Sequence, residues 1–328
     1  MTRRALTWLA AVVPLAWLAG CAKVANPWEG KAGPPRALAS FPPLYCFVKN
    51  VAGEHAGLIS LCTTTGPHHY QYNVQDMLYL AGADLFFANG LTFDEQFTDK
   101  LYKGGASPRL RYVKLGDVLP HRLLLGHIDE DGRKHTHADG TVCEHGEHDP
   151  HVWLGIPQAL AMVARIRDEL KQADPAHAAD YDANAAAYTK QLKKLHADGM
   201  KLLETKKDRK LITFHESLAY FAHKDSFKLT VAGVIMEGPG DEPSSPGLAR
   251  LLDLIAREKI RVLAVEPQYP TTTSARVLIK EVENKGIDPI ALVEIDPLET
   301  ATAQDLQDPE WYVRKMRANL RNLARALP

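Results

Sequence analysis

The sequence lacks an excess of charge of either sign. Its 328 residues include 39 basic and 40 acidic side chains, which leaves a formal net charge of -1 at pH 7. Proteins that bind nucleic acid or anionic membrane surfaces usually carry a clustered excess of basic residues, so neither partner is favoured. Apolar residues make up 45% of the chain, which argues against overall disorder. The length favours about two domains.

A hydrophobic run long enough to span a membrane is also missing. Arg3 and Arg4 precede an apolar stretch, residues 5–18, and small residues follow it. This stretch is shorter than the roughly 20 residues of a spanning helix. A basic start, an apolar centre and a small-residue end are typical of a signal peptide, which we assign to residues 1–20. The mature chain is therefore expected outside the cytoplasm.

The residues around Cys21 predict how the exported chain is held. Leu18-Ala19-Gly20-Cys21 resembles the lipobox of bacterial lipoproteins. The resemblance implies cleavage before Cys21 and a lipid on its thiol, which would anchor the protein through burial of the acyl chains. The alternative is an ordinary cleaved signal in which Cys21 is incidental. Residues 21–35 are rich in Gly, Pro and small side chains, so we predict a linker followed by a fold that starts near Arg36.

Cysteine is scarce, with four in the whole chain. Export implies an oxidising compartment in which Cys46, Cys62 and Cys143 can pair, although an odd number leaves one over. Cys46 and Cys62 flank one predicted strand–helix–strand turn, which makes a disulfide between them possible. The sequence does not fix the distance between them.

Short aliphatic and β-branched runs alternate with helical stretches in two sets. The first set is ALASF, GLISLC, DLFFA and LRYVKL, and the second is KLITF, LTVAGVI, RVLAV and IALVEI. This alternation predicts an α/β protein with parallel sheets and crossover helices. We expect two lobes, residues 36–173 and 206–328, each with a parallel sheet flanked by helices.

Residues 174–205 separate the two sets and predict one long connecting helix. Tyr181, Tyr188, Leu195 and Leu202 recur every seven residues, with Ala185, Leu192 and Gly199 offset by four. Asp174 is the expected N-cap, with Pro175 at the first helical position. The alternative is a break at Gly199, but the apolar stripe keeps its phase through that residue.

Candidate metal ligands follow the predicted strands. His215 comes directly after KLITF, Asp296 directly after IALVEI, and His68 a few residues after GLISLC, whereas His151 precedes a helix. The carboxyl ends of parallel strands meet at the edge where ligands bind. Singly, each histidine is more often structural, and Asp296 before Pro297 is compatible with a turn or helix cap.

Three imidazoles and one carboxylate suit zinc. Four protein ligands also close the coordination shell, whereas catalytic zinc usually keeps a position for water, so the set favours binding over hydrolysis. His69 is an alternative to His68, because it offers a second imidazole in the same turn.

Five motifs in this order resemble the zinc- and manganese-binding solute-binding proteins of bacterial ABC transporters: PHHYQ, DPHVWL, TFHES, EPQY and IDPL. The resemblance implies two lobes, a rigid connecting helix and one metal in the cleft between them. Its ligands would be His68, His151, His215 and Asp296. Manganese-selective relatives tend to have glutamate at the third position, so His215 places this chain with the zinc type. We do not expect Glu266 of EPQY to be a ligand. Its expected role is structural, at the end of a strand.

A histidine-rich loop is predicted near residues 121–148. Seven of the 14 histidines lie between His121 and His151. Within it, His135, His137, His145 and His148 resemble the loop of many zinc-type members and are expected to collect auxiliary zinc. The alternative is a solvated loop whose composition has no further meaning.

The sequence therefore predicts a monomeric, lipid-anchored protein on the periplasmic side that binds zinc and delivers it to the permease of an ABC importer, without catalysis. One alternative is an extracytoplasmic zinc hydrolase with Glu216 or Glu266 as general base. Others are a manganese-binding solute-binding protein and a histidine-rich adhesion or metal-storage protein.

Overall fold

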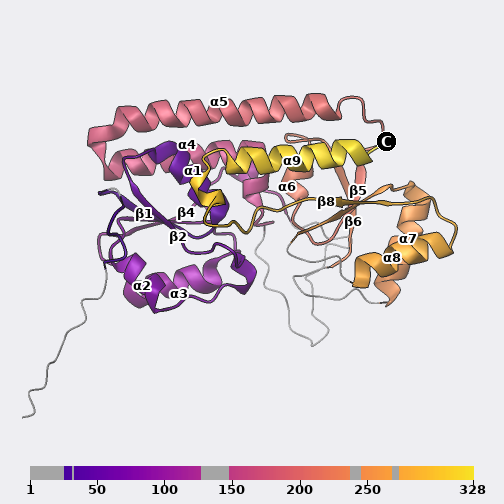
Figure 1. The fold of residues 1–328 in the computed structure, drawn as a ribbon, viewed down its shortest axis with the longest axis horizontal. Coiled ribbons are helices and arrows are strands. Elements are labelled where there is room, and N and C mark those ends of the chain that lie inside the picture. The colour runs from indigo at the N-terminus through magenta and orange to yellow at the C-terminus, as the bar shows by residue number, and fades with distance from the viewer. Residues whose placement is uncertain (1–25, 32, 127–147, 237–244, 268–272) are drawn as a thin grey trace, which may run out of the picture.

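The computed structural model describes residues 26–31, 33–126, 148–236, 245–267 and 273–328. They form two α/β lobes that lie side by side beneath one long helix (Figure 1). The signal peptide, Cys21, Cys143 and most of the histidine-rich loop lie outside the described residues. Within the described part of the chain, none of the helices combines the length and apolarity that crossing a bilayer requires.

The N-terminal lobe is built on a four-stranded parallel sheet with the order β2-β1-β3-β4. Its strands are β1 (Arg36–Ala39), β2 (Gly57–Ser60), β3 (Leu85–Ala88) and β4 (Arg111–Lys114). Its helices are α1 (Pro42–Ala52), α2 (Val74–Ala81), α3 (Glu95–Gly105) and α4 (Ile156–Ala173). β1 and β3 are almost completely buried, as expected for central strands covered on both faces.

The C-terminal lobe repeats this arrangement with the order β6-β5-β7-β8, again all parallel. Its strands are β5 (Lys210–Thr213), β6 (Thr230–Val234), β7 (Val262–Val265) and β8 (Ala291–Glu294). Its helices are α6 (Ala219–Ala222), α7 (Ser245–Glu258), α8 (Thr273–Asn284) and α9 (Trp311–Ala326). All eight predicted runs form strands, so the predicted fold class is confirmed.

The long helix α5 (Ala178–Leu203) has 26 residues and begins later than the sequence predicted. A 3₁₀ turn, Pro175–His177, precedes it. Asp174 makes no backbone cap; its carboxylate instead accepts the hydroxyl of Tyr181 at 2.7 Å. At the far end Leu203 is buried and Leu202 is 41% exposed, because a helix of 3.6 residues per turn drifts away from a seven-residue repeat.

Helix α5 is continuous through Gly199. A Cβ at this position would lie 2.6 Å from Cε1 of Phe227 and 2.8 Å from Cδ1 of Leu320 on α9. The glycine therefore permits close approach of the neighbouring elements and does not break the helix. In Figure 1, α5 runs above both lobes and α9 lies directly beneath it.

The possible disulfide between Cys46 and Cys62 is absent from the structure, in which both thiols are free and buried. Cys46 points from α1 toward α5, where its Sγ lies 3.9 Å from the hydroxyl of Tyr188 and 3.6 Å from the carbonyl of Pro309. Burial raises the pKa of the Cys46 thiol to about 11, so this thiol is unreactive at neutral pH.

Two apolar cores stabilise the described part of the molecule. The large core contains buried residues of the N-terminal lobe, α5, α9 and one face of the second sheet, including Leu211, Val262 and Ala264. The small core lies between the other face of that sheet and helices α7 and α8, and includes Ile212, Phe214 and Leu263. The boundary between the two cores thus runs through the second sheet and not between the lobes.

Candidate metal centre

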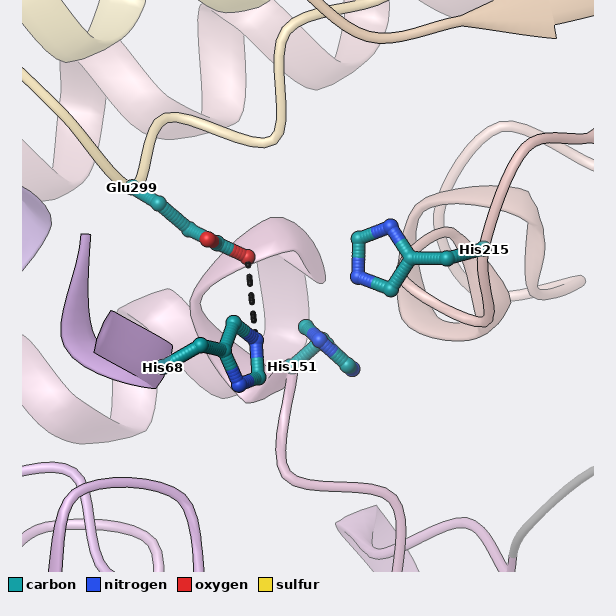
Figure 2. Close-up of side chains that lie close together, drawn as sticks. All are labelled: His68, His151, His215 and Glu299. Carbon is teal, nitrogen blue, oxygen red and sulfur yellow. Dashed lines mark ion pairs between the residues drawn. The ribbon is translucent and has the colours of Figure 1, made fainter. Parts of the chain in front are cut away.

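Four side chains from different parts of the chain meet between the lobes: His68, His151, His215 and Glu299. One ligand atom from each lies within 4.8 Å of the others. Figure 2 shows the three rings and the carboxylate facing a common point. His151, His215 and Glu299 are buried, and His68 is partly exposed.

Strand ends place three of these side chains. His68 lies in a 3₁₀ turn, Pro67–His69, that follows β2, and His215 follows β5. Glu299 lies in the segment after β8, and His151 directly precedes the 3₁₀ turn Val152–Leu154 that leads into α4. The carboxyl edges of both sheets therefore supply side chains to one site, as expected for open parallel sheets.

Buried polar atoms in this group lack hydrogen-bond partners among the described residues. They are Nε2 of His68, Nε2 of His151 and Oε1 of Glu299. Nε2 of His68 and Oε1 of Glu299 lie 3.6 Å apart, which is longer than a hydrogen bond (Figure 2). Buried polar atoms are nearly always paired, so three such atoms around one point fit a cation between them.

In two of the rings, those of His151 and His215, Nδ1 contacts a carboxylate. Nδ1 of His151 lies 3.0 Å from Oδ1 of Asp149, which also accepts the backbone N–H of His151 at 2.8 Å. Nδ1 of His215 lies 2.5 Å from Oε1 of Glu266, which also accepts the hydroxyl of Ser217 at 3.1 Å. Such carboxylates fix the tautomer, with the proton on Nδ1 and the lone pair of Nε2 available to a metal.

The sequence alone did not point to Asp149 as a partner of His151 or to Glu266 as a partner of His215. Glu266 was expected to have a structural role at the end of β7, and its observed partner is His215. Asp149 belongs to the DPH motif, and a carboxylate two residues before a candidate ligand is a signal for this kind of support.

The charges of the group shift two pKa values in opposite directions. Burial alone would lower the pKa of His215, but the charge and hydrogen bond of Glu266, with smaller contributions from Glu299 and Asp149, raise it to about 9. Burial alone would raise the pKa of Glu299, but the ion pair with His68 and the charges of the other two histidines lower it to about 2. Without a metal, the group thus holds a negative carboxylate beside cationic imidazole.

The expectation that Asp296 completes the set is corrected, because the carboxylate at the centre belongs to Glu299. Oδ2 of Asp296 accepts a hydrogen bond from Nζ of Lys315 at 2.7 Å. Its Oδ1 accepts the backbone N–H of Leu298 at 2.8 Å. Asp296 is therefore engaged with α9 and with its own turn, and Glu299 points into the site in its place (Figure 2).

The histidines outside this group are placed as follows. His69 is exposed and not part of the group, so the geometry selects His68 of the two adjacent imidazoles. His148 packs edge to face with His121, with ring centroids 5.3 Å apart, and is also outside the group. His135, His137 and His145 lie outside the described residues.

Two α/β lobes, a long helix over both and a buried three-histidine, one-carboxylate group between them define a metal-binding solute-binding protein. The family model for ZnuA, described as zinc-uptake complex component A, periplasmic, matches residues 38–326. The chain belongs to this family, and the resemblance of its five motifs is confirmed.

Known relatives agree with this assignment. The zinc-binding lipoprotein AdcA of Streptococcus pneumoniae (strain ATCC BAA-255 / R6) is 30% identical over 289 residues, which cover 87% of this chain and 54% of AdcA. The chain thus spans about half the length of this curated relative. The Zn(II)-bound ZnuA-like domain of Streptococcus pneumoniae AdcA is similar at 26% identity and a TM-score of 0.67, covering 90% of this chain and 99% of that domain.

A more distant structure shares the fold. The periplasmic zinc-binding protein TroA from Treponema pallidum has a TM-score of 0.73 at 22% identity, and the match covers 90% of this chain and 99% of TroA. Such a likeness in three dimensions supports the two-lobe architecture of the chain.

Proposed function

We propose that this protein binds one zinc ion through His68, His151, His215 and Glu299 and delivers it to an ABC importer. The observation that carries the proposal is the meeting of these four ligand atoms within 4.8 Å in a buried site. Family membership and the zinc named for AdcA support the same ion.

The donor set favours zinc over manganese. Three neutral imidazole nitrogens are borderline-soft donors that suit zinc, whereas manganese is better matched by carboxylate and carbonyl oxygens. The one carboxylate, Glu299, would balance part of the ion's charge in a buried place. A given protein site also usually binds zinc much more tightly than manganese.

The same geometry favours cargo binding over hydrolysis. Four protein ligands complete a tetrahedral shell, and a catalytic zinc needs a position for water. Glu266, the alternative general base of a hydrolase, is engaged with His215 and Ser217. Delivery to a permease, and not turnover, would then be the protein's task.

Location and partners form part of the proposal. We expect a lipid on Cys21, residence on the periplasmic side of a membrane, and action as a monomer that docks on a permease. AdcA is named a lipoprotein, and the LAGC sequence at residues 18–21 supports the same anchor here. A Cys21→Ala variant should move from the membrane fraction to the soluble fraction.

The direct test is metal content. The mature chain, purified without metal-affinity resin, should retain about one zinc per chain and exchange it for manganese only at large excess. His151→Ala should lose the tight site, whereas His223→Ala, which alters a partly exposed histidine beside Asp225, should keep it. Preferential retention of manganese, or equal losses in both variants, would refute the proposal.

A further inference from the structure

A buried hydrogen bond links the segments of two proposed zinc ligands across the lobes. Nε1 of Trp153 donates to the carbonyl oxygen of Pro297 at 2.7 Å. Trp153 lies two residues after His151, and Pro297 lies two residues before Glu299. The indole is completely buried, so water does not compete for this bond.

The Trp153 ring has a fixed position. It packs against Phe41 and Phe93, with centroid distances of 4.7 Å in both pairs. Its backbone carbonyl accepts the hydroxyl of Tyr312 on α9 at 2.6 Å. Phe93 also contacts the ring of His68, with the centroids 4.9 Å apart, so the same aromatic group borders the metal centre.

The turn that carries Glu299 needs such an external contact. Leu298 has a φ of 65°, a left-handed conformation that costs a branched residue about 1 kcal/mol or more. Asn319 on α9 binds both the N–H and the carbonyl of Asp296, at 3.0 and 2.7 Å. These bonds fix the start of the turn to α9, and the Trp153 bond fixes its middle to the N-terminal lobe.

Beyond Glu299 the chain is again tied to the N-terminal lobe. The N–H of Ala301 donates to the carbonyl of Thr63 at 2.9 Å. Glu299 therefore lies between two hydrogen bonds to the other lobe, one at Pro297 and one at Ala301. Glu299 is part of the C-terminal lobe in the sequence, but the hydrogen bonds on both sides of it attach its segment to the N-terminal lobe.

We infer that Trp153 is a positioning residue, which fixes Glu299 relative to His151 and so sets the separation of two ligands from opposite lobes. The inference rests on the proposed function, since it requires Glu299 to bind the ion. The indole N–H acts through the carbonyl of Pro297 and does not touch the metal.

A double-mutant cycle tests this role. Zinc affinity is measured by competition with a chromophoric chelator for the wild type, Trp153→Phe, Glu299→Gln and the double variant. Trp153→Phe should weaken binding by about ten- to a hundredfold, as expected for loss of an outer support of a ligand. In the Glu299→Gln background the same change should cost no more than about twofold, because the ligand it positions is already absent.

Spectroscopy adds a readout that a general loss of stability does not move. Co²⁺ in the site should show altered visible bands in Trp153→Phe at full occupancy, since a displaced carboxylate changes the ligand geometry. Trp311→Phe is the matched control: Trp311 is 1% exposed, lies in the same core, and its Nε1 lacks a hydrogen-bond partner among the described residues. It should leave the bands unchanged.

If Trp153→Phe does not fold, incorporation of benzothienylalanine at position 153 removes the N–H and keeps the ring size. Additive losses in the cycle, or unchanged Co²⁺ bands with the ring N–H removed, would overturn the positioning role while the ligand assignment stands. Unchanged zinc affinity in Glu299→Gln would overturn the ligand assignment and this inference with it.

Discussion

Nδ1 of His215 and Oε1 of Glu266 lie 2.5 Å apart, and both side chains are buried. The carboxylate comes from the residue after β7, and the imidazole from the end of the neighbouring strand β5. Adjacent strands thus supply a proposed ligand, His215, and the carboxylate that contacts its ring. Nε2 of His215 is directed toward the other three side chains as a result (Figure 2).

Glu266→Gln should weaken zinc binding by about tenfold, because the amide can still accept the ring N–H but no longer carries the charge that increases the basicity of His215. The measurement is chelator competition at constant pH, paired with an NMR titration of His215 in the metal-free protein. The pKa of His215 should fall from its value near 9. Ser217→Ala, which removes another partner of Oε1, serves as a control and should have a smaller effect on both quantities.

The metal-free protein should be most stable between about pH 4.5 and pH 6.5. His215 has a pKa raised from 6.5 to about 9 by the fold, so its stabilisation is complete below 6.5 and is lost as the pH rises through 9. Glu299 has a pKa lowered from 4.5 to about 2, so its stabilisation is present above 4.5 and is lost as the pH falls toward 2. Thermal melts with a chelator present measure this profile.

With zinc bound, the stability of the protein should increase with pH above about 6.5, where that of the metal-free protein decreases. Protons compete with the ion for the imidazoles, so zinc affinity should increase from about pH 5 to about pH 8. A metal-free protein that gains stability between pH 6.5 and about pH 9 would contradict the contribution of His215. His215→Gln should flatten the alkaline limb and leave the acidic limb in place.

The zinc affinities of Glu299→Gln and Asp296→Asn should show which of the two carboxylates binds the ion. We expect Glu299→Gln to cost more than about a hundredfold in zinc affinity, because it removes a charged donor from a buried shell, and removing even an outer support costs up to that much. Asp296→Asn weakens the contact with Lys315 and should cost less zinc affinity, with a lower melting temperature of the metal-free form. The reverse order of affinities would restore Asp296 as the ligand.

Gly199→Ala should destabilise the protein by about 1–3 kcal/mol, although alanine favours helix by up to about 1 kcal/mol. The added methyl group would overlap Phe227 and Leu320, which pack on α5 from the C-terminal lobe and α9. Urea denaturation of the metal-free form measures the change in free energy of unfolding. Gly104→Ala in α3, where a Cβ meets open space, should be neutral or stabilising.

The sequence was sufficient for the two sheets and the long helix, because alternating apolar runs and a continuous stripe are local patterns. It also pointed to His68, His151 and His215, whose positions follow from strand ends. It failed at the carboxylate. The choice of Glu299 over Asp296 depends on Lys315, 19 residues further along the chain, and on the left-handed backbone of Leu298. Neither contact leaves a local sequence pattern.

The disulfide prediction failed for a related reason. Spacing along the chain placed Cys46 and Cys62 around one turn, but the direction of the Cys46 side chain is set by packing of α1 against α5. The seven-residue repeat likewise placed Leu202 on the apolar stripe, whereas this side chain is 41% exposed, because the repeat is slightly shorter than two turns of the real helix.

The division of the apolar core has a consequence for local unfolding. His215 directly follows Phe214, and Ile212 and Phe214 pack in the small core with α7 and α8. The segments that carry His68, His151 and Glu299 border the large core, which joins both lobes. A cooperative unit with few buried side chains opens at a lower free energy than a large one. Transient opening of the α7 and α8 layer would therefore loosen β5 first, so His215 would be the proposed ligand whose contact with a bound ion fluctuates most.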